Sequence, residues 1–111
     1  MSAHPLSAGK TYCLRLPDGR AIGHVHVQAI EDCWAEGPFT PAPAFAEFRE
    51  LFERADQLAR DQIIPLWEKA ADAIDALHIQ VVEERDGARH DGLRVYIAGD
   101  EASIGIPLCV L

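Results

Sequence analysis

The longest stretch of regular hydrophobic spacing lies between Pro43 and Leu77. Large apolar residues recur there mostly every three or four positions, as one face of a helix requires. They are Phe45, Phe48, Phe52, Ile63, Leu66, Trp67, Ile74 and Leu77. Charged and amide side chains occupy the opposite face. The spacing predicts an amphipathic helical segment over residues 43–77.

Pro65 interrupts this segment. A proline inside a helix removes one backbone hydrogen bond and clashes with the preceding turn. A straight helix of this length would extend about 50 Å at about 1.5 Å per residue, which is too long for a compact chain of 111 residues. We therefore predict a kink or a break near residues 61–65, with helices at about 43–63 and 65–76.

Alternating apolar and polar residues predict strands on both sides of the helical segment. Before it, residues 12–16 and 21–31 are expected to form an antiparallel hairpin around a Pro17-Asp18-Gly19 turn. The proline-rich residues 32–42 are expected to be an extended connection. After the helices, the pattern predicts strands at about 78–85, 93–97 and 103–106.

The order of these elements, ββ-α-βββ, predicts an α+β fold. We expect a mainly antiparallel sheet of four to five strands, with a long, Pro-kinked or broken helix packed on one face. A chain of 111 residues is expected to form a single domain over residues 1–111. Residues 1–9 are small or polar and are expected to be flexible.

The strand at residues 21–31 has two different faces. Val25 and Val27 lie on the face expected to be buried, and His24, His26 and Gln28 lie on the other. Two histidines separated by one residue on a strand project from the same side and could share a metal ion. Alternating polar residues on a solvent-facing strand produce the same pattern. His24 and His26 are therefore candidate ligands of a divalent transition metal or ordinary surface residues.

Other candidate binding residues are aromatic or lie on outward strand faces. Trp34 and Phe39, in the proline-rich connection, could anchor a partner or cover the end of the core. Arg94 and Tyr96 alternate with apolar residues and are expected to face outward. The candidate binding residues are Trp34, Phe39, Gln28, Tyr96 and Arg94.

The charge and cysteine content restrict the partners. The formal charge of −8 argues against nucleic acid and anionic membranes, which require clustered Lys and Arg. There is no apolar run of about 20 residues, the length of a membrane span, and no signal-peptide pattern. Three cysteines without CxxC spacing suggest reduced thiols and a cytoplasmic location.

Signatures of catalysis are absent from the sequence: there is neither a G-x-S-x-G elbow nor a G-x-x-x-x-G-K phosphate loop. We predict a small acidic cytoplasmic protein-interaction or regulatory module without catalytic activity or cofactor. Its expected partner is a second copy, as a homodimer, or another protein, and the acidic charge is compatible with a basic one. One alternative is a metal-dependent or small-ligand-binding enzyme using His24 and His26. Another is an immunity- or antitoxin-like protein that occludes a basic partner.

Overall fold

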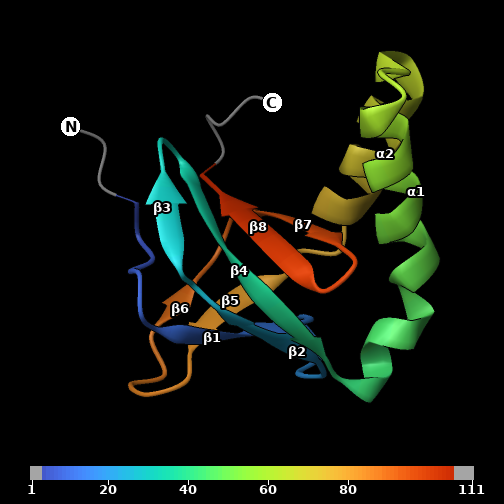
Figure 1. Ribbon diagram of the computed structural model, residues 1–111. Coiled ribbons are helices and arrows are strands. Elements are labelled where there is room, and N and C mark those ends of the chain that lie inside the picture. Colours follow the sequence, from blue (N-terminus) through green and yellow to red (C-terminus); the bar gives the residue numbers. More distant parts are fainter. Residues whose placement is uncertain (1–3, 107–111) are drawn as a thin grey trace.

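The computed structural model describes residues 4–106, and this part of the chain has an α+β architecture (Figure 1). The strands are β1 Thr11–Arg15, β2 Ala21–His26, β3 Ala29–Glu31, β4 Trp34–Pro41, β5 Gln80–Glu83, β6 Arg89–His90, β7 Arg94–Ala98 and β8 Glu101–Gly105. Between β4 and β5 lie a 3-10 helix, η1 Pro43–Glu47, and two α-helices, α1 Arg49–Arg60 and α2 Ile64–Asp75. None of these helices is long and apolar enough to cross a membrane.

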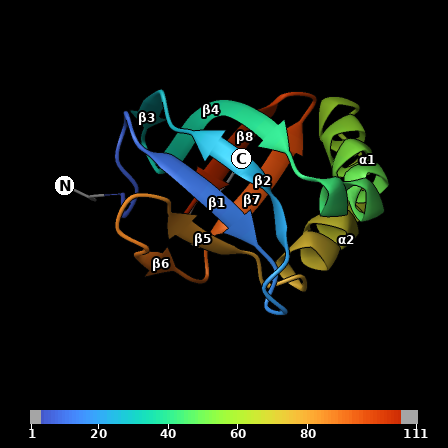
Figure 2. The ribbon, with the colours of Figure 1, turned by 90° about the horizontal axis from the view of Figure 1, so that it is seen from below.

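All strands pair antiparallel, in the order β6-β5-β1-β2-β4-β8-β7, with β3 paired to β4. The sheet curls strongly, and Figure 2 shows its strands arranged around a central core. The helices lie together on one side of the sheet (Figures 1 and 2), where α1 contacts β7 and η1 contacts β2. Because β7 is a terminal strand of the sheet, the contact with α1 helps to shield an otherwise open edge.

The predicted strand number of four to five is wrong, because the described residues form eight strands. Residues 21–31 form two strands rather than one, and residues 34–41, predicted to be a connection, form β4. Pro38 and Pro41 are tolerated in β4 because a proline φ is compatible with extended backbone. Gly37 is also required there, since a Cβ at this position would overlap the carbonyl oxygen of His26.

The predicted break in the helical segment is confirmed. The chain leaves α1 through Asp61 and Gln62, and Gln62 has a φ of 57°. Pro65 lies in the first turn of α2, where its missing N–H would have no helical partner in any case. The proline therefore helps to start the second helix instead of bending a continuous one.

The core joins the inward-facing residues of the curled sheet to buried residues of the helices. Val25, Val27, Val95 and Ile97 belong to one buried cluster that also contains Phe52 of α1. The inward faces predicted for β2 and β7 are thus confirmed. The helical stripe is confirmed only in part, because several of its other members near the helix break are exposed to solvent.

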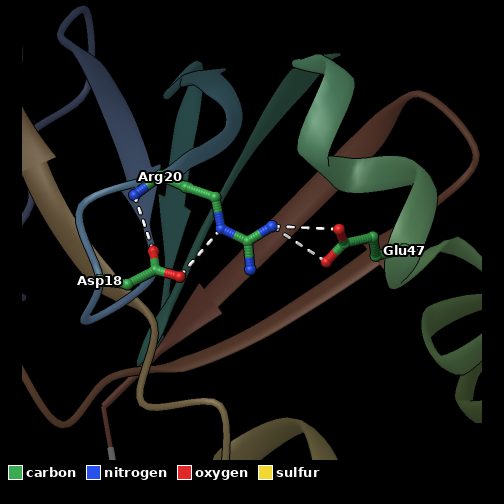
Figure 3. A network of polar contacts seen from close by, with 3 residues as sticks. All are labelled: Asp18, Arg20 and Glu47. Atoms are coloured by element: carbon green, nitrogen blue, oxygen red, sulfur yellow. Dashed lines mark hydrogen bonds and ion pairs between the residues drawn. The ribbon is translucent and has the colours of Figure 1, made fainter.

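The turn between β1 and β2 is tied to η1 by Arg20 (Figure 3). The backbone N–H and Nε–H of Arg20 donate to the two carboxylate oxygens of Asp18, each at 2.9 Å, and its Nη1 donates to both oxygens of Glu47 at 3.1 Å. The backbone hydrogen bond from Arg20 is the main reason that the pKa of Asp18 is lowered. Gly19 has a φ of 94°, so the predicted turn and hairpin are confirmed.

The start of the described chain is packed against the sheet. Leu6 is only 2% exposed, and the His4 Nε2 lies 3.0 Å from the carbonyl oxygen of Ile104. Residues 4–9, predicted to be flexible, therefore have defined contacts.

The cysteines differ from one another. Cys13 is a buried free thiol, whereas Cys33 is disulfide-bonded, so the prediction of reduced cysteines is wrong for Cys33. Cys109 lies outside the described residues.

Candidate functional site

The outer face of the β4–β8–β7 region carries a set of side chains whose positions follow from strand register. Three cross-strand rows run over this face, since every second residue of each strand points outward. The rows are Trp34–Gly105–Arg94, Glu36–Ser103–Tyr96 and Pro38–Glu101–Ala98. The residues between them, such as Ala35, Ile104 and Val95, are buried in the core.

The indole of Trp34 lies across β8 because position 105 is a glycine. A Cβ on Gly105 would lie 2.7 Å from Cζ3 of Trp34 and 2.9 Å from its Cε3. The indole reaches over this strand to Tyr96 on β7, with 5.7 Å between ring centroids and an interplanar angle of 51°. The absence of a side chain on the middle strand thus allows two aromatic residues from flanking strands to meet.

A third aromatic ring reaches the same place from the helices. Trp67, on the first turn of α2, has its ring centroid 6.2 Å from that of Tyr96, with an interplanar angle of 30°. Tyr96 therefore contacts both Trp34 and Trp67. We call these three residues the aromatic row. The chain contains two tryptophans, and both belong to this row.

A pocket of about 330 Å³ lies where the helices meet this outer face. The sheet contributes Trp34, Tyr96, Glu36, Glu101 and Ser103 from the three rows, and α1 contributes Phe52, Ala55, Asp56 and Ala59. Small alanines on the helix leave space next to the rings. The volume is within the range of about 300–1,000 Å³ that is typical of sites for small ligands.

The pocket is negatively charged. Its lining contains the carboxylates of Glu36, Asp56 and Glu101 and no Lys, Arg or His. Asp56 is paired with Arg60 at 3.0 Å between Oδ2 and Nε. Within residues 4–106, neither glutamate has a cationic side chain at ion-pairing distance. Two unneutralised carboxylates beside aromatic rings create a favourable site for a cation.

Tyr96 offers its ring, and not its hydroxyl group, to the pocket. The hydroxyl oxygen is inaccessible to solvent and has no hydrogen-bond partner in the described part of the chain. Burial raises the pKa of Tyr96, with nearby Arg94 acting in the opposite direction. Burial also raises the pKa of Asp75 on α2. The Oδ2 of Asp75 lies 3.9 Å from Nη2 of Arg94 on β7. The hydroxyl end of Tyr96 is thus directed toward these helix-side charges.

The structure brings together some of the predicted binding residues and separates others. Trp34 and Tyr96 line the pocket, and Arg94 is next to them but paired with Asp75. Gln28 is exposed, and its backbone N–H donates to the carbonyl oxygen of Glu36 at 2.8 Å. Phe39 instead lies in the core, 4% exposed, and presents no surface to a partner.

Glu36, Glu101 and Trp67 also line the pocket and were not among the residues predicted to bind. Recognising the glutamates requires the pairing of β4 with β8, and the sequence predicts a connection, not a strand, at these residues. Trp67 has an indirect signal in the sequence, since it closely follows Pro65 and shares the first turn of its helix. Its distance from Tyr96 depends on how α2 docks.

His24 and His26 both lie on the outer side of β2, as the alternation predicts, but outside the pocket lining. His24 forms a close ion-pair contact with Glu84 through Nδ1. The Nδ1 of His26 lies 2.9 Å from Oγ1 of Thr11. Among residues 4–106, no group of three His, Cys, Asp or Glu side chains is arranged to hold a metal ion. A metal site at these histidines stays a prediction.

Comparison with known proteins gave no match: no family model, curated protein or solved structure corresponds to this chain.

Proposed function

We propose that the protein is a protein-interaction module without chemistry of its own, and that its pocket binds a cationic side chain of a basic partner protein. The observation that supports this proposal is the combination of the aromatic row with Glu36 and Glu101 in one pocket. A cation over an aromatic face gains about 0.5–1 kcal/mol at an exposed site and about 2 kcal/mol when desolvated. The carboxylates add attraction of the same sign.

The overall charge supports a basic partner. A formal charge of −8 attracts a basic protein over long range and accelerates their encounter, and this effect weakens as salt is added. The same charge disfavours nucleic acid as the partner. No compartment is proposed, because a disulfide such as that of Cys33 is typical of oxidising environments and removes the cysteine argument for the cytoplasm.

A homodimer, the other expected partnership, has one observation in its favour. Ile63, Ile64 and Leu66, at the turn between α1 and α2, are 41%, 49% and 42% exposed. All three lie within residues 63–66 and form an exposed apolar patch where α2 begins. Such a patch is small compared with the roughly 800 Å² per partner of a stable interface, so we propose at most weak self-association through it.

The binding proposal is tested with the tryptophans as the reporter. Because both Trp34 and Trp67 contact Tyr96, intrinsic tryptophan fluorescence and the two indole N–H resonances report on the pocket without a label. A lysine- and arginine-containing peptide and its acidic counterpart are titrated at low and high salt. We expect the basic peptide alone to perturb both indoles, with affinity that falls as salt rises.

A charge-matched pair of variants supplies the control. Glu36→Gln with Glu101→Gln removes two carboxylates of the pocket, and Glu50→Gln with Glu53→Gln removes two exposed carboxylates of α1 that do not line it. Both variants change the net charge equally. Only the first should lose binding of the basic peptide. Equal losses would mean that net charge, and not the pocket, attracts the peptide, and no binding by the unmodified protein would refute the proposal.

A further inference from the structure

Ser103 lies at the centre of the pocket floor. Its cross-strand neighbours are Glu36 on one side and Tyr96 on the other, and Glu101 is two residues before it on the same strand. Adjacent strands are about 4.8 Å apart and alternate residues along a strand are about 7 Å apart. A small side chain is thus surrounded by two carboxylates and one aromatic ring, with Trp34 across Gly105 completing the surface.

We propose that this position binds the guanidinium group of an arginine supplied by the partner. Its plane lies against the rings of Tyr96 and Trp34, and its N–H groups donate to the carboxylates of Glu36 and Glu101. This inference rests on the proposed function and specifies the ligand of the same pocket. It joins the two features of the site, because a guanidinium is the cation that both stacks on aromatic faces and pairs with carboxylates through a planar fork of donors.

The other common cations satisfy only one of these features. A lysine ammonium is compact and strongly hydrated, and it needs acceptors in three directions. The aromatic rings on one side of this floor provide no hydrogen-bond acceptor, so the ammonium would keep part of its hydration shell or lose hydrogen bonds. A quaternary ammonium suits aromatic faces but has no donor for Glu36 and Glu101. The pocket would then hold two carboxylates that lose water and gain no hydrogen bond.

The pocket also has room for the rest of an arginine side chain. Ala55 and Ala59 of α1 line the wall opposite the sheet, and they leave apolar surface for the methylene groups of a long side chain, which commonly lie along such surface. Trp67 continues this surface on α2. An arginine can therefore enter along the helices and place its charged end over Ser103.

The test compares four peptides that differ at one position. The sequence Gly-Ser-Xaa-Ser-Gly carries arginine, lysine, trimethyl-lysine or citrulline at the variable position and is titrated into the full chain by NMR. The indole resonances of Trp34 and Trp67 report binding. We expect arginine to bind about tenfold more tightly than lysine or trimethyl-lysine, since only the guanidinium donates two parallel N–H bonds to carboxylates while its plane stacks on the rings. Citrulline, which has a similar shape without the charge, should bind most weakly.

The two charge-matched double variants distinguish a failure of the arginine inference from a failure of the proposed function. In Glu36→Gln with Glu101→Gln, the preference for arginine over lysine should disappear, whereas Glu50→Gln with Glu53→Gln should retain it. Circular dichroism and thermal melting establish that each variant is folded. Equal affinity for arginine and lysine, tighter binding of trimethyl-lysine, or an arginine preference that survives the pocket variant would overturn the inference while leaving a cation-binding module intact. Binding of none of the charged peptides would instead refute the proposed function.

Discussion

Replacing Gly105 by alanine should disturb the aromatic row with little direct effect elsewhere. The added methyl group would lie 2.7, 2.9 and 3.0 Å from three ring carbons of Trp34, whereas carbon atoms in ordinary contact are about 3.5–4.0 Å apart. The indole must therefore lift from β8 by several tenths of an ångström or more. Because Trp34 contacts Tyr96 at this point, we expect the ring contact to loosen as well.

The expected cost follows from two opposing effects. Overpacking of this kind costs about 1–3 kcal/mol, while replacing a strand glycine returns about 0.5–1 kcal/mol through reduced freedom of the unfolded chain. The net loss of unfolding free energy should be about 0–2.5 kcal/mol by the same estimates. In a domain of about 100 residues, each kcal/mol lowers Tm by about 4–8 °C.

The assay is urea unfolding followed by tryptophan fluorescence and circular dichroism, applied to a double-mutant cycle. Gly105→Ala is measured in the natural chain and again in a Trp34→Ala background, where the methyl group no longer meets a ring. In that background the substitution should be neutral or stabilising, which gives a coupling energy between the two positions. If Gly105→Ala costs the same with and without the indole, the position of Trp34 over this glycine is wrong.

Three further predictions concern other parts of the molecule. Gly37→Ala should strongly destabilise the protein or prevent folding, as measured by urea unfolding, because its Cβ would overlap the His26 backbone; an unchanged midpoint would contradict the path of β4. Burial raises the pKa of Asp75 above 3.8 in the folded protein. The contribution of Asp75 to stability is therefore present below its pKa in the unfolded chain and is lost as pH rises through its pKa in the folded protein. The stability of Asp75→Asn relative to the natural chain should therefore increase with pH between 3.5 and 7, and a decrease would show that pairing with Arg94 outweighs burial. Zn²⁺ should leave Tm unchanged, because no third His, Cys, Asp or Glu side chain among residues 4–106 completes a metal site with His24 and His26; a rise in Tm that His24→Ala with His26→Ala abolishes would re-establish the metal site.

Local features of the sequence were sufficient to predict several elements of the fold. The β1–β2 hairpin follows from the Pro17-Asp18-Gly19 turn, and the break between α1 and α2 follows from Pro65 together with the length of the helical segment. The buried faces of β2 and β7 follow from simple alternation. Each of these predictions depends on residues within about one element of one another, where local sterics and periodicity dominate.

The remaining elements depend on contacts between distant residues. Pro38 and Pro41 locally disfavour a strand, but β4 forms because it has partners on both edges and because Gly37 allows close approach to β2. Without β4, the register that places Glu36 beside Ser103 cannot be derived. Ile63 fits the helical period yet is exposed, because it lies in the turn where the period ends. Trp34 and Tyr96 could therefore be named from sequence as binding candidates, while Glu36, Glu101 and Trp67 and their grouping with these rings could not.

The aromatic row brings together residues 34, 67 and 96, contributed by an early strand, a central helix and a late strand. No fragment lacking any one of these elements carries the complete row, so the proposed arginine site exists only in a fully folded chain. By mass action, occupancy should slow hydrogen exchange that requires global unfolding and leave local fraying unaffected. The proposed binding site and the global stability of the fold are then coupled through the same three rings.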